Sequence, residues 1–165
     1  RVERHAQVVD RAGWRREVVD EVDRLGDGHR LDHVVVHERE RVVAEVRDCL
    51  VERAQACAAV GIARDRIVLD PGIGFGKTLE HNVALLARQR ELVSLGSPLL
   101  VGWSRKSTLG TITGRAVGQR LHASVAAALM AVERGAQIVR VHDVAATVDA
   151  LKVWCATIAP EVKTP

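Results

Sequence analysis

The fold is decided around residues 69–78, which read LDPGIGFGKT. The apolar run IVL at 67–69 leads into this stretch and stops at the turn sequence DPG, which indicates a buried strand entering a loop. The ending GKT is shared with the phosphate-binding loop of nucleotide-binding proteins, G-x-x-x-x-G-K-[ST]. Pro71 stands where that loop needs its first glycine, and proline has no N–H to donate to a phosphate. The stretch therefore favours a different kind of binding loop.

The segments on either side of this loop alternate between strand and helix. Apolar spacing and turn residues predict, in chain order, a strand at 33–37 (HVVVH), a helix at 41–61, a strand at 67–69, a helix at 80–92, a strand at 98–103 (PLLVGW), a helix at 120–135, a strand at 137–144 (QIVRVHDV) and a short last helix capped by Thr147. Gly135 is expected to end the third of these helices in a left-handed conformation. Apolar residues at 18–25 indicate one further helix near the start.

This order of segments predicts an α/β fold with parallel strands, because each apolar strand is followed by a helix. Four strand–helix units amount to half of a (β/α)8 barrel, which needs about 250 residues when complete. An incomplete barrel is one expected architecture, and a small open sheet is the other. Residues 42–165 form the expected half-barrel domain, and residues 1–41 are an unassigned segment.

Charged and polar residues follow each of the later strands. Asp70 ends one strand, the run SRKS at 104–107 ends the next, and Arg140 and His142 lie two apart in the last. Each of these has an ordinary explanation on its own, as a turn residue, a surface charge or a structural histidine. Because parallel strands bring their carboxyl ends to one edge, we expect a carboxylate, an ammonium, a guanidinium and an imidazole to meet there.

The glycine loop indicates the shape of the expected ligand. Gly72, Gly74 and Gly76 alternate, which leaves backbone that a flat molecule can approach closely. Phe75 is placed to stack on a ring, and Ser107 is placed to hold a carboxylate. These residues predict a site for a flat, hydrogen-bonding heterocycle together with anionic groups.

Composition limits the partners. With 47% hydrophobic and 27% charged residues, the 165-residue chain is typical of one globular domain. The net charge of +3 is modest, and no basic stripe with interleaved aromatic residues points to nucleic acid. No apolar run approaches the ~18 residues of a membrane span, and three cysteines without a C-x-x-C pair fit free thiols in a reducing compartment. We expect a cytoplasmic protein with neither a nucleic-acid nor a membrane partner.

Three motifs, taken together, resemble those of the dihydropteroate synthase family. They are DPGIGFGKTLEHN, PLLVGWSRKS and RVHDV, and the similarity extends over roughly residues 42–155. The resemblance implies the C-terminal half of a TIM barrel and a transferase of folate biosynthesis. Such enzymes join 6-hydroxymethyl-7,8-dihydropterin pyrophosphate to p-aminobenzoate and release pyrophosphate, and sulfonamides occupy the aminobenzoate site. The related pterin-binding methyltransferases are disfavoured, because SRKS followed by RVHDV matches the synthases.

The resemblance also implies roles for individual residues. Lys106, Arg140 and His142 would act on the departing pyrophosphate and the reacting centre. Asp70 would accept hydrogen bonds from the pterin, and Ser107 would hold the aminobenzoate carboxylate. The full set placed at the substrates is Asp70, Gly74, Phe75, Gly102, Arg105, Lys106, Ser107, Arg140 and His142.

Magnesium is implied as a cofactor by the resemblance alone, because the asparagine motif that serves it in the family is not visible in residues 1–32. No residue of this sequence is therefore assigned as a metal ligand. A truncated, catalytically silent pterin-binding protein is the alternative function. Open sheet edges of a half barrel also predict pairing with a second copy, and hence a homodimer.

Overall fold

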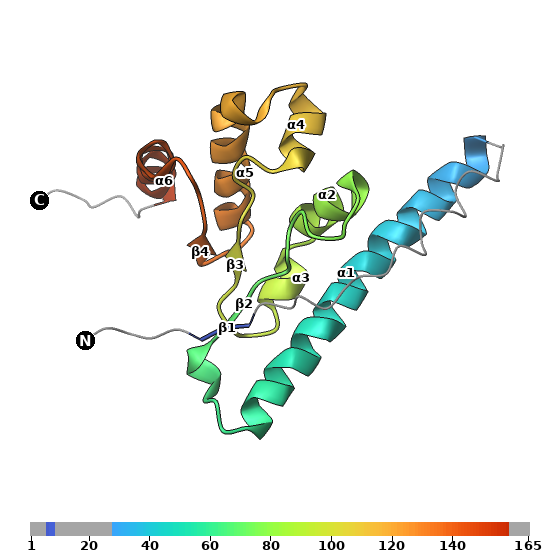
Figure 1. Ribbon diagram of the computed structural model, residues 1–165, viewed down its shortest axis with the longest axis vertical. Coiled ribbons are helices and arrows are strands. Elements are labelled where there is room, and N and C mark those ends of the chain that lie inside the picture. Colours follow the sequence, from blue (N-terminus) through green and yellow to red (C-terminus); the bar gives the residue numbers. More distant parts are fainter. Residues whose placement is uncertain (1–5, 9–27, 159–165) are drawn as a thin grey trace, which may run out of the picture.

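Short parallel strands lie at the centre of the molecule, with helices around them (Figure 1). The computed structural model describes the backbone of residues 6–8 and 28–158 and the side chains of residues 39–158. The elements, in chain order, are β1 (Ala6–Val8), α1 (Gly28–Ala59), β2 (Ile67–Leu69), α2 (Leu79–Ala87), α3 (Arg90–Val93), β3 (Leu100–Val101), α4 (Ser107–Thr113), α5 (Leu121–Glu133), β4 (Ile138–Val139) and α6 (Val144–Ile158). One-turn 3₁₀ helices at Arg64–Arg66 and Val117–Gln119 complete the description.

The strands are parallel and follow one another in space in chain order. β1 pairs with β2 in the register Ala6 to Ile67, and β3 pairs with β4 in the register Leu100 to Ile138. A single bridge from Leu69 to Leu99 joins the two pairs. The prediction of an α/β fold with parallel strands is confirmed. The carboxyl ends of β2, β3 and β4 consequently open towards the same edge.

The core lies between the strands and one face of each surrounding helix. All three residues of β2 are buried, as the apolar run IVL predicted. Helix α1 contributes Val42, Val43, Val46 and Leu50 at the spacing of one helical face, and it packs on α2 and β2. The buried Gln89 donates from Nε2 to the carbonyl of Ala131 at 2.7 Å, which ties the turn before α3 to α5.

The strand predicted at 33–37 is wrong. These residues lie within α1, which begins at Gly28 and continues without interruption to Ala59. The run HVVVH is followed directly by the helical sequence ERERVVAEVRD, with no glycine or proline to end a strand. A three-residue apolar run has no periodicity that separates a strand from part of a helix, and the long helix has more backbone hydrogen bonds to gain.

Other differences concern elements that the sequence pattern did not reveal. β1 forms in the segment that was left unassigned, and α1 runs across the boundary drawn at residue 42. The predicted helix at 80–92 is divided into α2 and α3, and α4 forms between the strand predicted at 98–103 and the helix predicted at 120–135, where no element was predicted. The last helix begins at Val144, and the Thr147 hydroxyl donates back to the carbonyl of Asp143 instead of capping it. The helix predicted at 18–25 lies outside the described residues.

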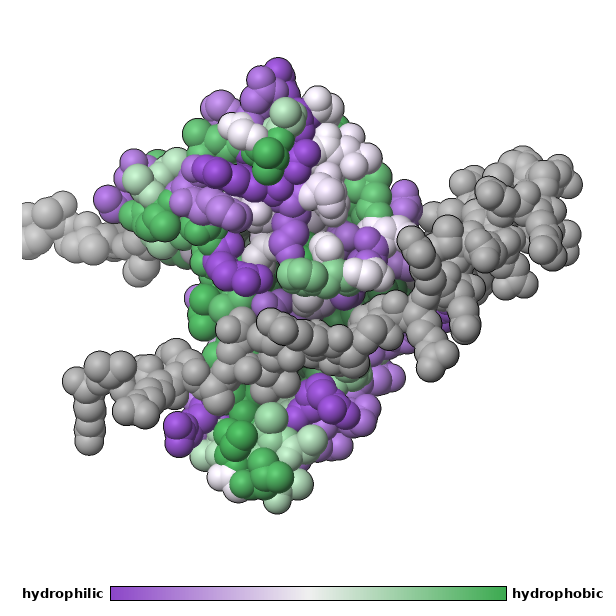
Figure 2. All heavy atoms as spheres, in the orientation of Figure 1, coloured by the Kyte–Doolittle hydropathy of each residue, from purple (hydrophilic) through white to green (hydrophobic). Residues whose placement is uncertain are grey.

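The surface is mixed. Figure 2 shows polar side chains over much of the upper part of one face, with apolar side chains near the lower end, where α1 finishes. Val60, just beyond α1, has 78% of its surface exposed. Among the residues that the structure describes, no helix combines the length and the apolar composition that crossing a bilayer requires.

Val43 provides a test of the packing of α1 on the strands, because its side chain is fully buried. We expect Val43→Ala to lower the free energy of unfolding by about 2 kcal/mol, from the lost burial and the cavity that remains. Val60→Ala removes the same atoms from an exposed position and should change the free energy of unfolding by less than about 0.5 kcal/mol. Urea unfolding measures both. Equal effects of the two substitutions would show that α1 does not pack as described.

Candidate functional site

The glycine loop between β2 and α2 turns back on itself at the carboxyl end of β2. Gly72, Gly74 and Gly76 have φ values of +65°, +77° and +59°, which residues with a side chain rarely adopt. Asp70 fixes the start of the loop, since its Oδ1 accepts from the Gly72 N–H at 2.9 Å. The alternation of glycines seen in the sequence thus reflects three left-handed positions.

Asn82 holds the middle and end of the loop from the first turns of α2. Its buried side chain accepts from the Gly74 N–H at 2.8 Å and donates to the carbonyls of Thr78 and Lys77 at 2.7 and 3.3 Å. Thr78 in turn caps α2 by accepting from the His81 N–H. Asn82 was not among the predicted residues, although it is the chain's single asparagine and lies within the motif EHN.

Lys77 shows why the ending GKT does not form a nucleotide loop. Its Nζ donates to the carbonyls of Gly72 and Phe75 at 3.1 and 3.2 Å, so its ammonium group faces the loop's own backbone. A lysine of a nucleotide loop would contact phosphate oxygens instead. This geometry agrees with the prediction, based on the position of Pro71, that the stretch is not a nucleotide-binding loop.

Lys106 extends from the turn after β3 over the glycine loop. Its Nζ donates to the carbonyl of Ile73 and lies 4.0 Å from the centre of the Phe75 ring, a cation–π contact. Gly74 makes this approach possible, because a Cβ there would lie 2.6 Å from Lys106 Cδ. The Phe75 ring remains 62% exposed, so its other surface is open to a ligand.

Arg140, directly after β4, faces Asp70 across the strand ends. Its Nη2 lies 3.8 Å from Asp70 Oδ2, and the Asp70 side chain is only 6% exposed while that of Arg140 is 55% exposed. Gly102 leaves room for the guanidinium, since a Cβ there would lie 3.0 Å from Nη2. The contact between Asp70 and Arg140 brings the ends of β2 and β4 together, and Lys106 brings the end of β3 to the same glycine loop.

The electrostatics of this cluster act on Lys106. Burial lowers the pKa of the Lys106 ammonium group, the positive charge of Arg140 lowers it further, and the carboxylate of Asp70 opposes both. Two cations and one carboxylate thus share a small region next to exposed backbone and an aromatic ring. Such a region is suited to a ligand that carries both hydrogen-bond donors and negative charge.

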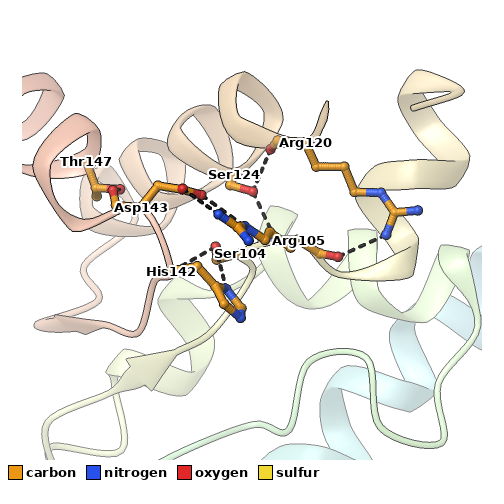
Figure 3. A network of polar contacts seen from close by, with 7 residues as sticks. All are labelled: Ser104, Arg105, Arg120, Ser124, His142, Asp143 and Thr147. Atoms are coloured by element: carbon orange, nitrogen blue, oxygen red, sulfur yellow. Dashed lines mark hydrogen bonds and ion pairs between the residues drawn. The ribbon is translucent and has the colours of Figure 1, made fainter. Parts of the chain in front are cut away.

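A second polar network joins the turn after β3 to the residues between β4 and α6 (Figure 3). The Arg105 guanidinium binds Asp143 through two hydrogen bonds, of 2.6 and 3.2 Å. The buried Ser104 Oγ accepts from the His142 N–H at 3.1 Å and lies 3.0 Å from His142 Nδ1. The hydrogen bond from Arg105 lowers the pKa of the Asp143 carboxyl, and the same bond raises the pKa of Arg105.

The predicted site residues therefore fall into two groups. One surrounds the glycine loop and contains Asp70, Gly74, Phe75, Gly102, Lys106 and Arg140. Arg105 and His142 belong to the second polar network, and Ser107 begins α4 with an exposed side chain. Further contact residues that sequence reasoning missed are Asn82, Ser104, Arg120, Ser124 and Asp143.

The described residues around the glycine loop do not form an evident set of magnesium ligands. Within the part of the chain that the structure describes, no three or more histidine, cysteine or acidic side chains come together as a metal site. Asp70, the one carboxylate of the cluster, already contacts a backbone N–H and a guanidinium. These residues do not fit a resident divalent cation.

The fold and the site define an α/β protein that gathers charged groups and a glycine loop at the carboxyl ends of parallel strands. A family model described as "Pterin binding enzyme" matches residues 4–142. The chain belongs to this family of pterin-binding enzymes. The matched range begins within the segment that was left unassigned in the sequence.

Named relatives agree with the family. A dihydropteroate synthase of Neisseria meningitidis serogroup B is 60% identical over 117 residues, which are 68% of this chain and 41% of that protein. The Escherichia coli K12 dihydropteroate synthase is 47% identical over 118 residues, 72% of this chain and 42% of that protein. The predicted resemblance to dihydropteroate synthases is confirmed. The chain spans less than half the length of these relatives.

Solved structures give the same result. The dihydropteroate synthase of Stenotrophomonas maltophilia is 56% identical with a TM-score of 0.71, over 74% of this chain and 46% of that one. The Xanthomonas albilineans enzyme, in complex with 7,8-dihydropteroate, is 54% identical with a TM-score of 0.71, over 72% and 46%. The prediction of a partial barrel related to these enzymes is confirmed.

Asn82 offers a test of how the glycine loop is held. We expect Asn82→Ala to leave the Gly74 N–H without its buried partner, at a cost of about 1–3 kcal/mol in the free energy of unfolding, while the Thr78 carbonyl keeps the backbone N–H of residue 82. Hydrogen exchange followed by NMR should show faster exchange at Gly74. The amide of Ala136, which bonds the Ala131 carbonyl, is the internal control. Unchanged protection at Gly74 would contradict the assignment of Asn82.

The ion pair between Arg105 and Asp143 should make the stability of the fold depend on pH in the acid range. Because Arg105 lowers the pKa of Asp143, the pair stabilises the fold above the ordinary aspartate pKa of about 3.9 and loses its effect as the pH falls through the lowered value. Arg105→Gln should raise the Asp143 pKa, measured from its carboxyl ¹³C shift. Arg47→Gln breaks an exposed pair with Asp48 and should leave the pKa of Asp143 unchanged. Equal Asp143 values in both variants would refute the pairing.

Proposed function

We propose that the chain carries the pterin-binding half of a dihydropteroate synthase active site. In this reaction 6-hydroxymethyl-7,8-dihydropterin pyrophosphate and p-aminobenzoate give 7,8-dihydropteroate and pyrophosphate. The observation that carries the proposal is the cluster of Asp70, Lys106 and Arg140 around the glycine loop. Membership of the pterin-binding family and the similarity to synthases support it.

Asp70 is proposed to recognise the pterin. One of its oxygens accepts from the Gly72 N–H, which fixes the carboxylate, and among the described side chains the other oxygen contacts only Arg140, at 3.8 Å. A carboxylate that accepts two N–H groups from a heterocycle needs this kind of orientation. Arg140 would pack against the pterin, and Gly102 gives its guanidinium the room to do so.

The proposed chemistry is charge stabilisation. The bond between the pterin methylene carbon and the pyrophosphate oxygen breaks, and its electron pair leaves with pyrophosphate. The p-aminobenzoate nitrogen then forms a bond to the methylene carbon and loses one proton to solvent. Lys106, Arg140 and His142 would stabilise the negative charge that develops on the departing group.

The second substrate is proposed to lie beside the loop. The exposed Phe75 ring and Gly74 would form the surface for the aminobenzoate ring, and Ser107 at the start of α4 would bind its carboxylate. Arg105 would line the same region while held by Asp143. Sulfonamides, as analogues of this substrate, would compete for it.

Further parts of the proposal come from the resemblance and composition. They are a cytoplasmic location, small-molecule substrates without nucleic-acid or membrane partners, and a homodimer. Magnesium belongs to the resemblance alone, and no step above depends on it.

The test measures binding and turnover separately with the full chain. We expect the pterin pyrophosphate to bind saturably in calorimetry, and Asp70→Asn to weaken binding about 10- to 100-fold, as for lost hydrogen bonds to a charged group. Pyrophosphate release is then followed with both substrates and magnesium in the buffer. Lys106→Ala should reduce release strongly. Lys152→Ala, which removes an exposed lysine, should leave it unchanged.

The outcomes separate the alternatives. Saturable binding without release, weakened by Asp70→Asn, would identify a pterin-binding protein that is silent on its own. Absence of binding would overturn the proposal. Turnover that Lys106→Ala leaves intact would refute the role given to that lysine.

A further inference from the structure

The turn after β3 contains an unfavourable backbone conformation. Arg105 has a φ of +58°, the one positive value among non-glycine residues in the described part of the chain. A left-handed arginine is unfavourable and persists only where its surroundings hold it. Lys106 follows directly, so the conformation of Arg105 sets the direction in which Lys106 leaves the turn.

The start of α5 holds this turn on both sides of the strained residue (Figure 3). Arg120 donates from Nη1 to the carbonyls of Arg105 and Lys106, at 2.9 and 3.3 Å. The buried Ser124 Oγ accepts from the Arg105 N–H at 2.9 Å. The backbone N–H and C=O of Arg105 are thus both bound by residues of the same helical turn.

Gly110 explains how the Arg120 guanidinium reaches the turn. It lies inside α4, where glycine is less favourable than alanine. A Cβ at Gly110 would overlap the guanidinium group of Arg120. The glycine leaves the space that the arginine occupies.

We propose that Arg120 is a positioning residue that fixes the 104–106 turn and thereby directs Lys106 over the glycine loop. Arg120 contacts the backbone of the turn and none of the reacting groups. The catalytic consequence of this placement rests on the proposed function, but the placement itself does not. Its direct effect is on the surroundings of the Lys106 ammonium group, which are Asp70, Arg140, the Phe75 ring and the Ile73 carbonyl.

The few lysines of the chain allow a direct measurement. Lysine occurs only at positions 77, 106, 152 and 163, so ¹³C-lysine labelling gives few Cε signals, and Lys106→Arg assigns the relevant one. Burial and Arg140 lower the pKa of Lys106, and release of the turn into solvent would reverse this. We expect Arg120→Gln to move the Lys106 titration upwards.

A second variant and two controls complete the design. Gly110→Ala retains Arg120 but fills its space, and it should shift Lys106 in the same direction. Arg134→Gln removes an equal charge at the other end of α5, where the guanidinium bonds the Met130 carbonyl, and it should leave Lys106 unchanged. Gly118→Ala adds a methyl group where no atom lies within 4 Å and should also have no effect.

The result that overturns the proposal is an unchanged Lys106 titration in a folded Arg120→Gln or Gly110→Ala protein. If Arg120→Gln does not fold, Gly110→Ala decides. Loss of folding in both would overturn the proposal in favour of a purely structural role for Arg120. Pterin binding, measured in parallel, should weaken in both variants. A shifted Lys106 in a chain whose wild type binds no pterin would support the positioning role and reject the proposed function.

Discussion

Parallel pairing of β2, β3 and β4 is the constraint on which the site depends. Each strand has only two or three residues in register, yet the pairing fixes where the chain goes next. Asp70, the 104–107 turn and Arg140 are far apart in sequence and leave the sheet at the same edge. Polar groups at that edge then meet without being carried by one continuous segment, as is usual for sites at the ends of parallel strands.

The proximity of charged residues at the strand ends could be predicted, because it follows from the direction of the strands alone. β2 was evident from IVL followed by DPG, and the approach of Arg140 to Asp70 follows from parallel pairing. The strand at 33–37 was not correctly predicted, since a short valine run has the same composition in a helix face and a strand. α4 was hidden by its threonines and glycine, which are weak helix formers.

Residues that act by contacting another segment of the chain were not predictable. Asn82 binds a loop eight residues away, and Asp143 binds an arginine 38 residues away. Their roles depend on tertiary distances that no local pattern encodes. Arg120 resembles any surface arginine in sequence, and its contacts arise only because α5 begins beside the turn after β3.

In addition to Gly74, which accommodates Lys106, two glycines accommodate arginine side chains from elsewhere in the fold: Gly102 accommodates Arg140, and Gly110 accommodates Arg120. Neither glycine has a left-handed conformation, so space alone restricts its replacement. The constraint to evolve jointly is strong for Gly110 and Arg120, where a Cβ would overlap the guanidinium, and weaker for Gly102 and the more exposed Arg140, where it would lie at 3.0 Å. Shortening the arginine first would make a larger residue at the glycine tolerable, whereas the reverse order passes through a steric conflict, so mutational paths through these positions have a preferred direction.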